Sequence, residues 1–522
     1  MILGEWSKGN VLNVVRILRC FYVCSGLRIN IRKSCLYGVG VSNAEVIEMA
    51  ELMGCRSDSL PFKYLGLTVG ANINRICNWR PVYDIFKSRL SLWKAKMLSF
   101  GGRVTLIRSV LEALPNYYIS LYKALAKVIH DLEIIIKKFL WGGSTDVRKT
   151  HWVAWDRVAS PRKVGGLGIC KLKFSNTALL AKWGWRFKTE PENLWVRVIS
   201  AIHLGLSNWD FLPIKNSVGG VWRSIVSVIN KPVAPNILIR SCFKGVVGNG
   251  EGVCFWLDPW LLDEPLKFRF PSLFRLEMVK GCSVKDRVGS DGIWLWRHEP
   301  NEDDEASELT GLMDLIRNFP LLDRRDAWRW LGCNSGVFSV SSVKSIILNS
   351  IDFSSRFVMK WCSWVPIKCN LFAWKAEMGR IPTAEALKKR GVIIEDEVCL
   401  LCSSEEETVD HLFTSCLVTS VLWQKVCTWS RVPLFFAFSF RDLLELYDHC
   451  GKKNEEKEIF HGIILITCWC VWKARNGARF NGLHIKIDDI FSDIRSLGFL
   501  WFRNRSKFKN IRWSDWCNFV FM

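Results

Sequence analysis

The sequence lacks long apolar runs and is poor in acidic residues relative to basic ones. Its longest apolar stretch, residues 463–472, is too short to span a bilayer and is typical of a buried helix. The first residues lack the basic start and apolar run of a signal peptide, so we expect an intracellular protein of nucleus or cytoplasm, with no membrane partner. Without a secretory signal, the 20 cysteines are expected to be reduced thiols.

The chain is rich in hydrophobic residues and carries a net positive charge. Its 522 residues are 49% hydrophobic and include 27 Trp, which excludes a disordered protein and predicts several domains. The 72 Lys and Arg outnumber the 50 Asp and Glu, and the net charge of +22 favours a polyanionic partner, most simply RNA or DNA.

The excess charge is concentrated in residues 61–190, which contain 23 Lys or Arg against 7 Asp or Glu. Tryptophans are interleaved with these cations, among them Trp79, Trp141, Trp152 and Trp183. This composition suits phosphate contact combined with base stacking. Core tryptophans beside ordinary solvated helix faces would give the same composition, so both interpretations stay open.

One cysteine and histidine pattern predicts a metal site. Cys399, Cys402, His411 and Cys416 have the spacing C-x2-C-x8-H-x4-C, which offers three thiolates and one imidazole to a single zinc ion. Four protein ligands fill a tetrahedral shell, so the site would be structural rather than catalytic. The alternative is a chance grouping in a chain that has 20 Cys and 8 His. On an ideal helix His411 and Cys416 would lie about 140° apart, so we expect the helix to break near Ser415.

Periodicity and turn residues predict an α+β, predominantly helical fold. The segments that we expect to be helical are residues 10–22, 82–100, 102–114, 121–141, 366–378, 384–390 and 460–502, with the break between the second and third at Gly101-Gly102. The strand-like segments are residues 27–34 and 62–67, the latter followed by a turn near Gly70, and two hairpins are predicted at 246–256 and 328–340.

A series of short motifs, taken in order, resembles one family. The motifs are SGLRINIRKS (residues 25–34), FKYLG (62–66), WKAKMLSFGGR (93–103), PRKVGGLG (161–168), ALLAKW (178–183), NGEGVCFWLD (249–258), VPIK (365–368), FAW (372–374), RIPT (380–383) and WKARN (472–476). They are similar to the polymerase tail of plant LINE-type (non-LTR) retrotransposons. The Cys/His set then resembles that family's reverse-transcriptase zinc-binding domain.

The resemblance implies five regions and a set of nucleic-acid contacts. The regions are the residual end of the palm (1–70), a basic helical thumb-like connector (71–190), a Trp-rich connecting region with hairpins (191–350), the zinc-binding domain (360–430) and a helical basic tail (455–522). Lys33 would correspond to a palm lysine near the phosphates of the incoming nucleotide, and residues 62–66 to the turn that grips the primer end. The implied nucleic-acid contacts are Lys33, Lys63, Tyr64, Lys94, Lys96 and Arg103.

The catalytic acids of that family have no counterpart in this sequence. Nucleotidyl transfer by two metal ions needs clustered carboxylates, and the resemblance places the family's Asp-Asp hairpin just before the helix that opens this chain. We therefore expect the fingers and most of the palm to be absent. The two Asp-Asp pairs, Asp303-Asp304 and Asp488-Asp489, are expected to be helix caps or solvated surface.

Three functions remain open on this basis. The first is a non-catalytic, zinc-stabilised remnant of a retrotransposon reverse transcriptase that binds RNA or DNA. The second is a protein-interaction module that uses the Trp-rich middle region. The third is a polymerase fragment that works only when its missing palm is supplied in trans.

Overall fold

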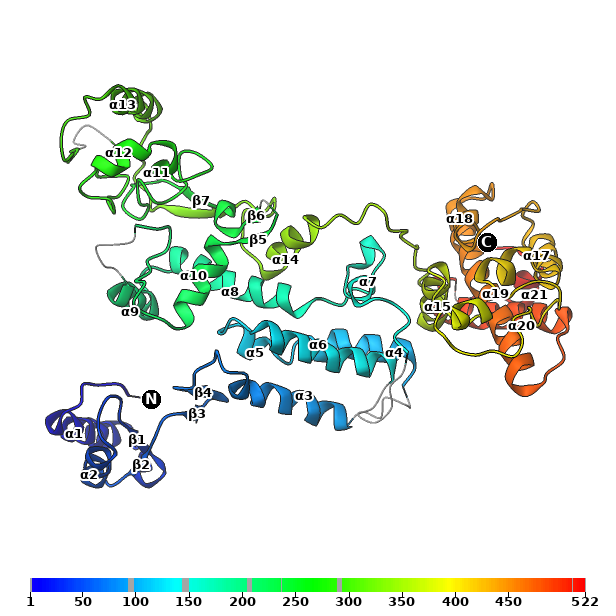
Figure 1. The fold of residues 1–522 in the computed structure, drawn as a ribbon, viewed down its shortest axis with the longest axis horizontal. Helices are drawn as coiled ribbons and strands as arrows, with labels where there is room; N and C mark the ends of the chain where they lie inside the picture. The colour runs from blue at the N-terminus through cyan, green and yellow to red at the C-terminus, as the bar shows by residue number, and fades with distance from the viewer. Residues whose placement is uncertain are drawn as a thin grey trace. The chain divides into compact units, whose positions relative to one another are not determined.

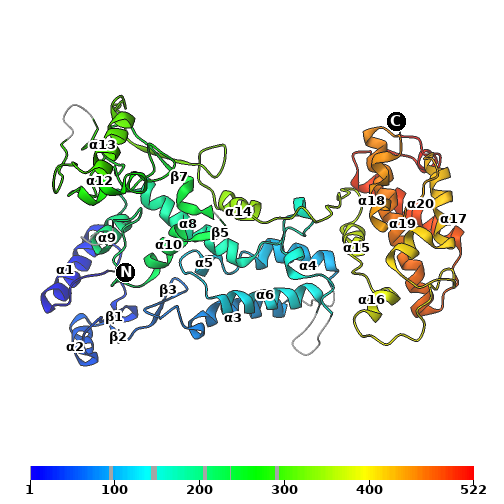
Figure 2. The same cartoon turned by 45° about the horizontal axis from the view of Figure 1, so that its top comes forward.

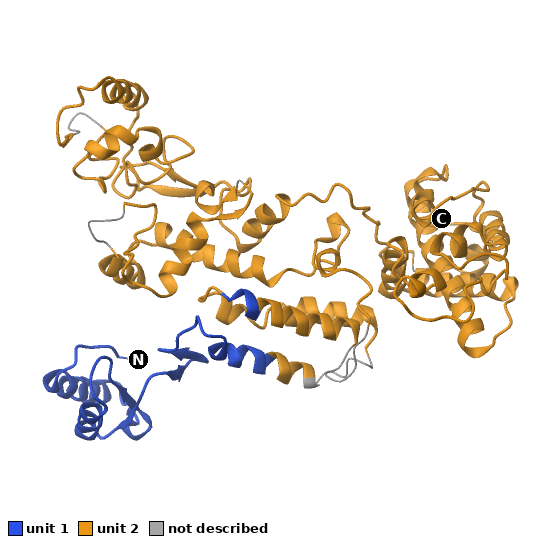
Figure 3. Cartoon of the chain, viewed as in Figure 1, with its two compact units in different colours: residues 1–85, 124–128 blue, residues 86–123, 129–522 orange. Residues whose placement is uncertain are grey.

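The computed structural model describes residues 2–92, 98–142, 150–203, 209–235, 237–288, 293–508 and 510–521. Helices predominate, and the strands in these ranges pair into four two-stranded sheets (Figure 1). The α+β, predominantly helical class predicted from the sequence is therefore confirmed. The chain divides into two compact units, residues 1–85 with 124–128 and residues 86–123 with 129–522 (Figure 3). The five regional boundaries given above stay predictions.

The first unit begins with two capped helices. Helix α1 (Lys8–Ser25) starts at Ser7, whose side chain accepts a hydrogen bond from Asn10 N–H, and ends at Gly26 in the left-handed conformation. Helix α2 (Asn43–Met53) starts with a capping box. The helix predicted over residues 10–22 is confirmed.

The strands of the first unit differ from the prediction. Residues 27–34 are not a strand, because the Asn30 side chain caps a short 3-10 turn, η1 (Ile31–Lys33). Strand β1 (Cys35–Tyr37) follows and pairs in parallel with β2 (Arg56–Asp58).

Residues 62–69 form a hairpin of β3 (Phe62–Tyr64) and β4 (Leu67–Val69). The chain reverses at Leu65 and Gly66, where both φ angles are positive (48° and 82°), as a two-residue hairpin turn of type I′ requires. The continuous strand predicted over residues 62–67 is therefore wrong, whereas the turn predicted near Gly70 is confirmed, since Gly70 follows β4 with φ 81°. A leucine at the first turn position gave no local sign of the reversal.

Helices α3 (Arg80–Leu92), α4 (Phe100–Leu106), α5 (Asn116–Ile119) and α6 (Ala126–Trp141) come next, with a π-helical turn η4 (Ile107–Leu111) after α4. Gly101 and Gly102 do not separate two helices, as the sequence suggested, because Ser99 caps α4 through Gly102 N–H. A Cβ on Gly101 would lie 2.6 Å from Ile367 Cγ2, so the glycine lets α4 pack closely on α15 (Ile367–Glu377).

The middle of the chain packs around two apolar clusters, one based on α8 and α10 and the other on residues 247–316. Its helices and strands are α7 (Trp155–Val158), η5 (Arg162–Val164), α8 (Leu172–Thr189), α9 (Leu194–His203), α10 (Val221–Asn230), β5 (Pro232–Ala234), β6 (Ile237–Leu238), η6 (Ile239–Cys242), β7 (Phe243–Val246), α11 (Leu266–Arg269), α12 (Pro271–Leu276), α13 (Asp303–Ile316), β8 (Ala327–Trp330) and α14 (Val340–Asn349).

Neither predicted hairpin forms in the middle region. Strand β7 pairs with β8, about eighty residues away, and Phe243 lies opposite Trp330. The segment that was predicted to turn at Asn249-Gly250 instead surrounds the carboxylate of Asp326. That carboxylate accepts hydrogen bonds from the backbone N–H groups of Gly248, Gly250 and Gly252 at 2.6, 2.9 and 2.7 Å. A distant charge therefore shapes this loop, and a local turn does not.

The C-terminal part is helical, as predicted. Its helices are α15, α16 (Ala384–Lys388), the π-helical turn η7 (His411–Ser415), α17 (Leu417–Ser430), α18 (Phe440–His449), α19 (Asn454–Asn481), α20 (Ile487–Arg505) and α21 (Trp513–Cys517). Helix α19 packs between α18 and α20 (Figure 2), and the apolar run 463–472 is buried in it, apart from the partly exposed Trp469. Within the described ranges, no helix has the length and apolar character needed to cross a membrane.

Candidate metal centre

Cys399 and Cys402 lie on a tight loop whose backbone closes on itself. Cys399 N–H donates to Glu405 C=O and Ser403 N–H donates to Cys399 C=O, both at 2.7 Å. Ser403 adopts a left-handed conformation with φ 54°, which turns the chain back immediately after the second cysteine. This loop presents two sulfurs to one point, as a C-x2-C zinc turn does.

His411 and Cys416 come from the junction of two helical segments. The turn η7 ends at Ser415, and Cys416 is extended (φ −65°, ψ 131°) before α17 begins at Leu417. Cys416 N–H donates to His411 C=O at 2.8 Å. The helix break predicted near Ser415 is therefore confirmed, and it places both side chains on the same side of the chain.

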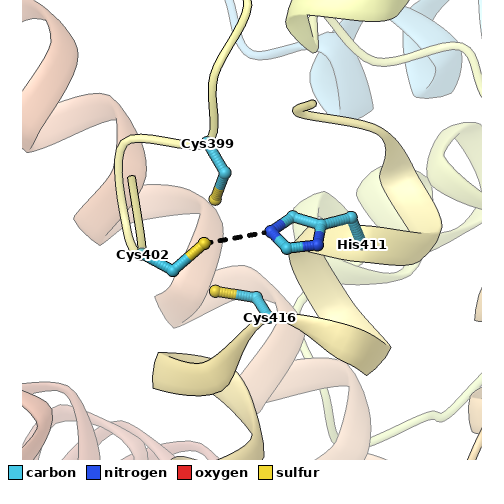
Figure 4. Close-up of side chains that lie close together, drawn as sticks. All are labelled: Cys399, Cys402, His411 and Cys416. Carbon is cyan, nitrogen blue, oxygen red and sulfur yellow. Dashed lines mark hydrogen bonds between the residues drawn. The ribbon is translucent and has the colours of Figure 1, made fainter. Parts of the chain in front are cut away.

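The four donor atoms converge (Figure 4). They all lie within 4.8 Å of one another, and Cys402 Sγ is 3.2 Å from His411 Nε2. Around a tetrahedral zinc ion with bonds of about 2.3 Å, two sulfurs would be about 3.8 Å apart. The donors therefore need to move together by about 1 Å at most. Cys399 and Cys416 are fully buried and His411 is 6% exposed, so the site is shielded from solvent.

Glu405 orients the imidazole from the far side. Its Oε2 lies 2.8 Å from His411 Nδ1, and a proton on Nδ1 leaves Nε2 free to bind metal. A carboxylate behind a metal-ligating histidine is the usual arrangement in such sites. The spacing of the four candidate ligands gave no indication of this role. An acidic residue shortly before a candidate histidine ligand could have suggested it.

The thiols of Cys399 and Cys416 shift each other's pKa in opposite directions. A hydrogen bond from Cys399, aided by the N–H groups of Val418 and Thr419 at the start of α17, lowers the pKa of Cys416 to about 5. The same hydrogen bond and burial raise the pKa of Cys399. Cys416 lies at the start of α17, where the partial positive charge of the helix N-terminus favours an anion.

A buried ion pair connects the metal loop to the helical core. Glu407 and Arg475, 1% and 4% exposed, contact at 2.6 Å, and the guanidinium donates to both carboxylate oxygens. Glu407 also accepts from Ala384 N–H at 3.1 Å, at the start of α16. The Arg475 guanidinium packs over the Trp472 ring. One carboxylate thus joins Arg475 of the 472–476 motif to the residue that directly follows the 380–383 motif, and no local pattern distinguishes Glu407 from its neighbours.

A second connection joins the zinc-binding region to the glycine-rich motif at 161–168. The Trp374 indole N–H donates to Gly165 C=O at 2.8 Å in a buried position. Gly165 has φ 78°, and a Cβ there would lie 2.6 Å from Phe357 C=O. Only glycine fits this close approach without strain, which gives a physical reason for glycine in that motif.

Comparison with known proteins finds similarity in one family model and two plant proteins. Residues 338–423 match the family model described as zinc-binding in reverse transcriptase. A putative ribonuclease H protein of Arabidopsis thaliana is 29% identical over 415 residues, covering 76% of this chain and 64% of that protein. An uncharacterized mitochondrial protein of the same plant is 29% identical over 153 residues, covering 29% of this chain and 95% of that protein. This chain is related to the reverse transcriptases of plant non-LTR retrotransposons.

The chain spans 64% of the length of the first relative. The matched region 338–423 contains Cys399, Cys402, His411 and Cys416. Among the side chains that the structure describes, these four form the one group of three or more His, Cys, Asp or Glu that is placed to hold a metal ion.

The predicted nucleic-acid residues lie in several different elements. Lys33 ends η1, and Lys63 and Tyr64 belong to β3; all three are exposed. Phe62 stacks on Tyr37 with ring centroids 3.9 Å apart, which links β3 to the strand that follows η1. These three contacts with nucleic acid stay predictions.

The other three predicted contacts are Lys94, Lys96 and Arg103. Lys94 and Lys96 fall outside the described residues. The Arg103 guanidinium donates to the carbonyls of Leu98 (3.2 Å) and Leu140 (2.9 Å), and burial lowers its pKa. Arg103 therefore has a structural role that the sequence did not indicate, and its contact with nucleic acid stays a prediction.

Both Asp-Asp pairs lie at helix starts, as expected. Asp303 and Asp304 are in the first turn of α13, and Asp488 and Asp489 are in the first turn of α20. All four side chains are exposed. Carboxylates at these positions stabilise the helix through its dipole.

Proposed function

We propose that this chain is a non-catalytic part of a retrotransposon reverse transcriptase, stabilised by structural zinc and able to bind RNA or DNA. The observation that carries the proposal is the convergence of three thiols and one imidazole within 4.8 Å, inside the region that matches the zinc-binding family. That donor set is typical of structural zinc.

The residues present fit a zinc ion held by Cys399, Cys402, His411 and Cys416. A zinc ion bound there would crosslink the loop that carries Cys399 and Cys402 to the helical turn η7 and the start of α17. It would not act as a Lewis acid, because four protein ligands fill its tetrahedral shell. The protein's own part is to hold the donors together. Glu405 fixes the imidazole, and the start of α17 stabilises the Cys416 thiolate.

The placement of the aspartate pairs supports the absence of polymerase chemistry in this stretch of chain. Two-metal transfer needs carboxylates that face one another across the ions. Asp303-Asp304 and Asp488-Asp489 are instead exposed at the starts of two different helices.

Charge supports nucleic-acid binding. The net charge of +22 and the surplus in residues 61–190 supply many possible phosphate contacts. Three of the residues predicted to contact nucleic acid, Lys33, Lys63 and Tyr64, lie exposed on the first unit.

Three measurements on the purified full chain test the proposal. Elemental analysis should find one zinc per chain, and Cys416→Ser should lose it while Cys427→Ser, a buried cysteine on α17, should keep it. Binding of a labelled oligonucleotide should weaken steeply as salt rises. A primer-extension assay with added divalent metal should show no templated incorporation. Nucleotide incorporation by the chain alone would refute the absence of catalysis. A wild-type chain that contains no zinc would refute the structural zinc site.

A further inference from the structure

A cleft of about 670 Å³ lies in the middle region, outside every segment discussed as a site so far. It is bordered by α10, η6 and α11. Its apolar lining includes Val226 and Ile214, and its aromatic lining consists of Trp209 and Phe268. The rest of the lining is polar or charged, so the cleft combines these four apolar and aromatic side chains with a larger number of polar ones.

The cleft has an excess of positive charge. Asp210 is the one carboxylate among its lining residues. The basic residues that line it are Arg223, Lys231, Arg240 and Lys267. Lys123, from the basic segment 61–190, adds a fifth cation nearby, since its Nζ is 3.5 Å from Ser227 Oγ.

The single carboxylate of Asp210 has several partners, so it does not neutralise the four positive charges that line the cleft. Its carboxylate accepts a 2.6 Å hydrogen bond from Asn230 Nδ2 and lies 3.9 Å from Arg240 and 3.7 Å from Lys267. Burial lowers the pKa of Lys267. An anion in the cleft would reduce this unbalanced positive charge.

The aromatic wall fixes two of the cations in place. The Arg240 guanidinium and the Lys267 ammonium lie 4.9 and 5.0 Å from the centroid of the Phe268 ring. That ring is nonetheless 46% exposed. Such a combination of cations with an exposed aromatic side chain is what proteins use to bind the phosphates and bases of a single strand.

One polar group in the cleft lacks a partner. Asn230 Oδ1 is buried and has no donor among the described residues, because Asp210 holds the amide so that its NH₂ group faces the carboxylate. A buried acceptor without a donor is costly. Because this oxygen is closed off from solvent, a ligand in the cleft would contact the cations and the aromatic side chains and not this acceptor.

We propose that this cleft binds one nucleotide unit of single-stranded nucleic acid, with the base against Trp209 and Phe268 and the phosphates on the basic rim. The inference rests on the proposed nucleic-acid binding and names a place for it that lies outside the palm-like and thumb-like segments. A double helix would not fit, because its bases are stacked and paired and cannot enter.

The first test compares binding of a fluorescently labelled single-stranded oligonucleotide and of its duplex to the full chain. Arg223→Gln with Lys231→Gln removes two exposed rim charges and should make the log–log salt slope for the single strand shallower by about 1.4. Phe268→Ala should weaken single-strand binding roughly tenfold and leave duplex binding unchanged. The matched control is Lys453→Gln with Arg503→Gln, which removes two exposed charges from the C-terminal helices.

The second test maps contacts directly with an oligonucleotide that carries 4-thiouridine. Photo-crosslinks should appear at Trp209 or Phe268. If the wild-type chain binds the strand but crosslinks only elsewhere, or if the control pair weakens binding as much as the rim pair, the cleft assignment is wrong and the proposed function stands. If the wild-type chain binds no nucleic acid at all, both fail together.

Discussion

Two irregular segments of this chain hold their shape in different ways. The zinc loop, residues 397–416, gathers three sulfurs and an imidazole around one point. The carboxylate loop, residues 248–258, is held by charged hydrogen bonds instead. Asp326 accepts from three glycine N–H groups, and buried Asp258 accepts from Cys254 N–H (2.8 Å) and pairs with Lys188 (2.6 Å).

The difference lies in where the stabilising free energy comes from. A carboxylate that accepts several backbone N–H bonds is part of the chain, so the carboxylate loop can form whenever the chain folds. The zinc loop brings three thiols and an imidazole together, and under the proposed function an ion from solution would stabilise it. A chelator should therefore destabilise the zinc loop and leave the carboxylate loop unchanged.

The largest expected effect separates the loops by removing metal. A chelator, or Cys416→Ser, should unfold the region around residues 365–425, because structural zinc contributes on the order of 10 kcal/mol to the folding of such sites. Amide hydrogen exchange should then rise across residues 397–423 and stay unchanged across 248–258. If removal of zinc left the exchange rates of both loops unchanged, or raised both equally, the two loops would not differ in their dependence on metal.

The ligand residues of the zinc loop could be predicted because they are close in sequence. Their spacing alone identified Cys399, Cys402, His411 and Cys416, and ideal helix geometry predicted the break at Ser415. The supports could not be predicted in the same way. Arg475 lies 68 residues from Glu407, and no local pattern indicates which arginine will meet which buried carboxylate.

The carboxylate loop shows the opposite case. Its Asn249-Gly250 sequence is a strong local turn signal, yet Asp326, far along the chain, determines the conformation. The β7–β8 pairing that brings Asp326 there is equally long-range. Helices such as residues 10–22 could be predicted because 3.6-residue periodicity is local, although others, such as α8 and α17, were not predicted. Strand partners and the cleft at α10 depend on tertiary contacts.

The next effect tests whether zinc acts alone. Arg475→Met should destabilise the chain by about 3–5 kcal/mol, because it leaves Glu407 buried without its partner. The double variant Glu407→Gln with Arg475→Met should lose less than the sum of the two single changes. Arg479→Met, one turn further along α19, serves as the control.

Chemical denaturation together with zinc content measures this effect. Zinc should still bind to the folded Arg475→Met protein, since none of its ligands changes. If Arg475→Met were as stable as the control, the zinc loop would need only its metal, and the contrast with the carboxylate loop would be sharper than the structure indicates.

The smallest effect concerns the carboxylate loop itself. Asp326→Asn replaces one accepting oxygen with an NH₂ group that faces a glycine N–H, so it should cost roughly 2 kcal/mol. Asp323→Asn changes an exposed carboxylate nearby and should cost almost nothing. The measurement is the denaturation midpoint, with hydrogen exchange at residues 248–252. Because zinc content should stay the same in both variants, a loss of zinc in Asp326→Asn would show that the two loops are coupled rather than independently stabilised.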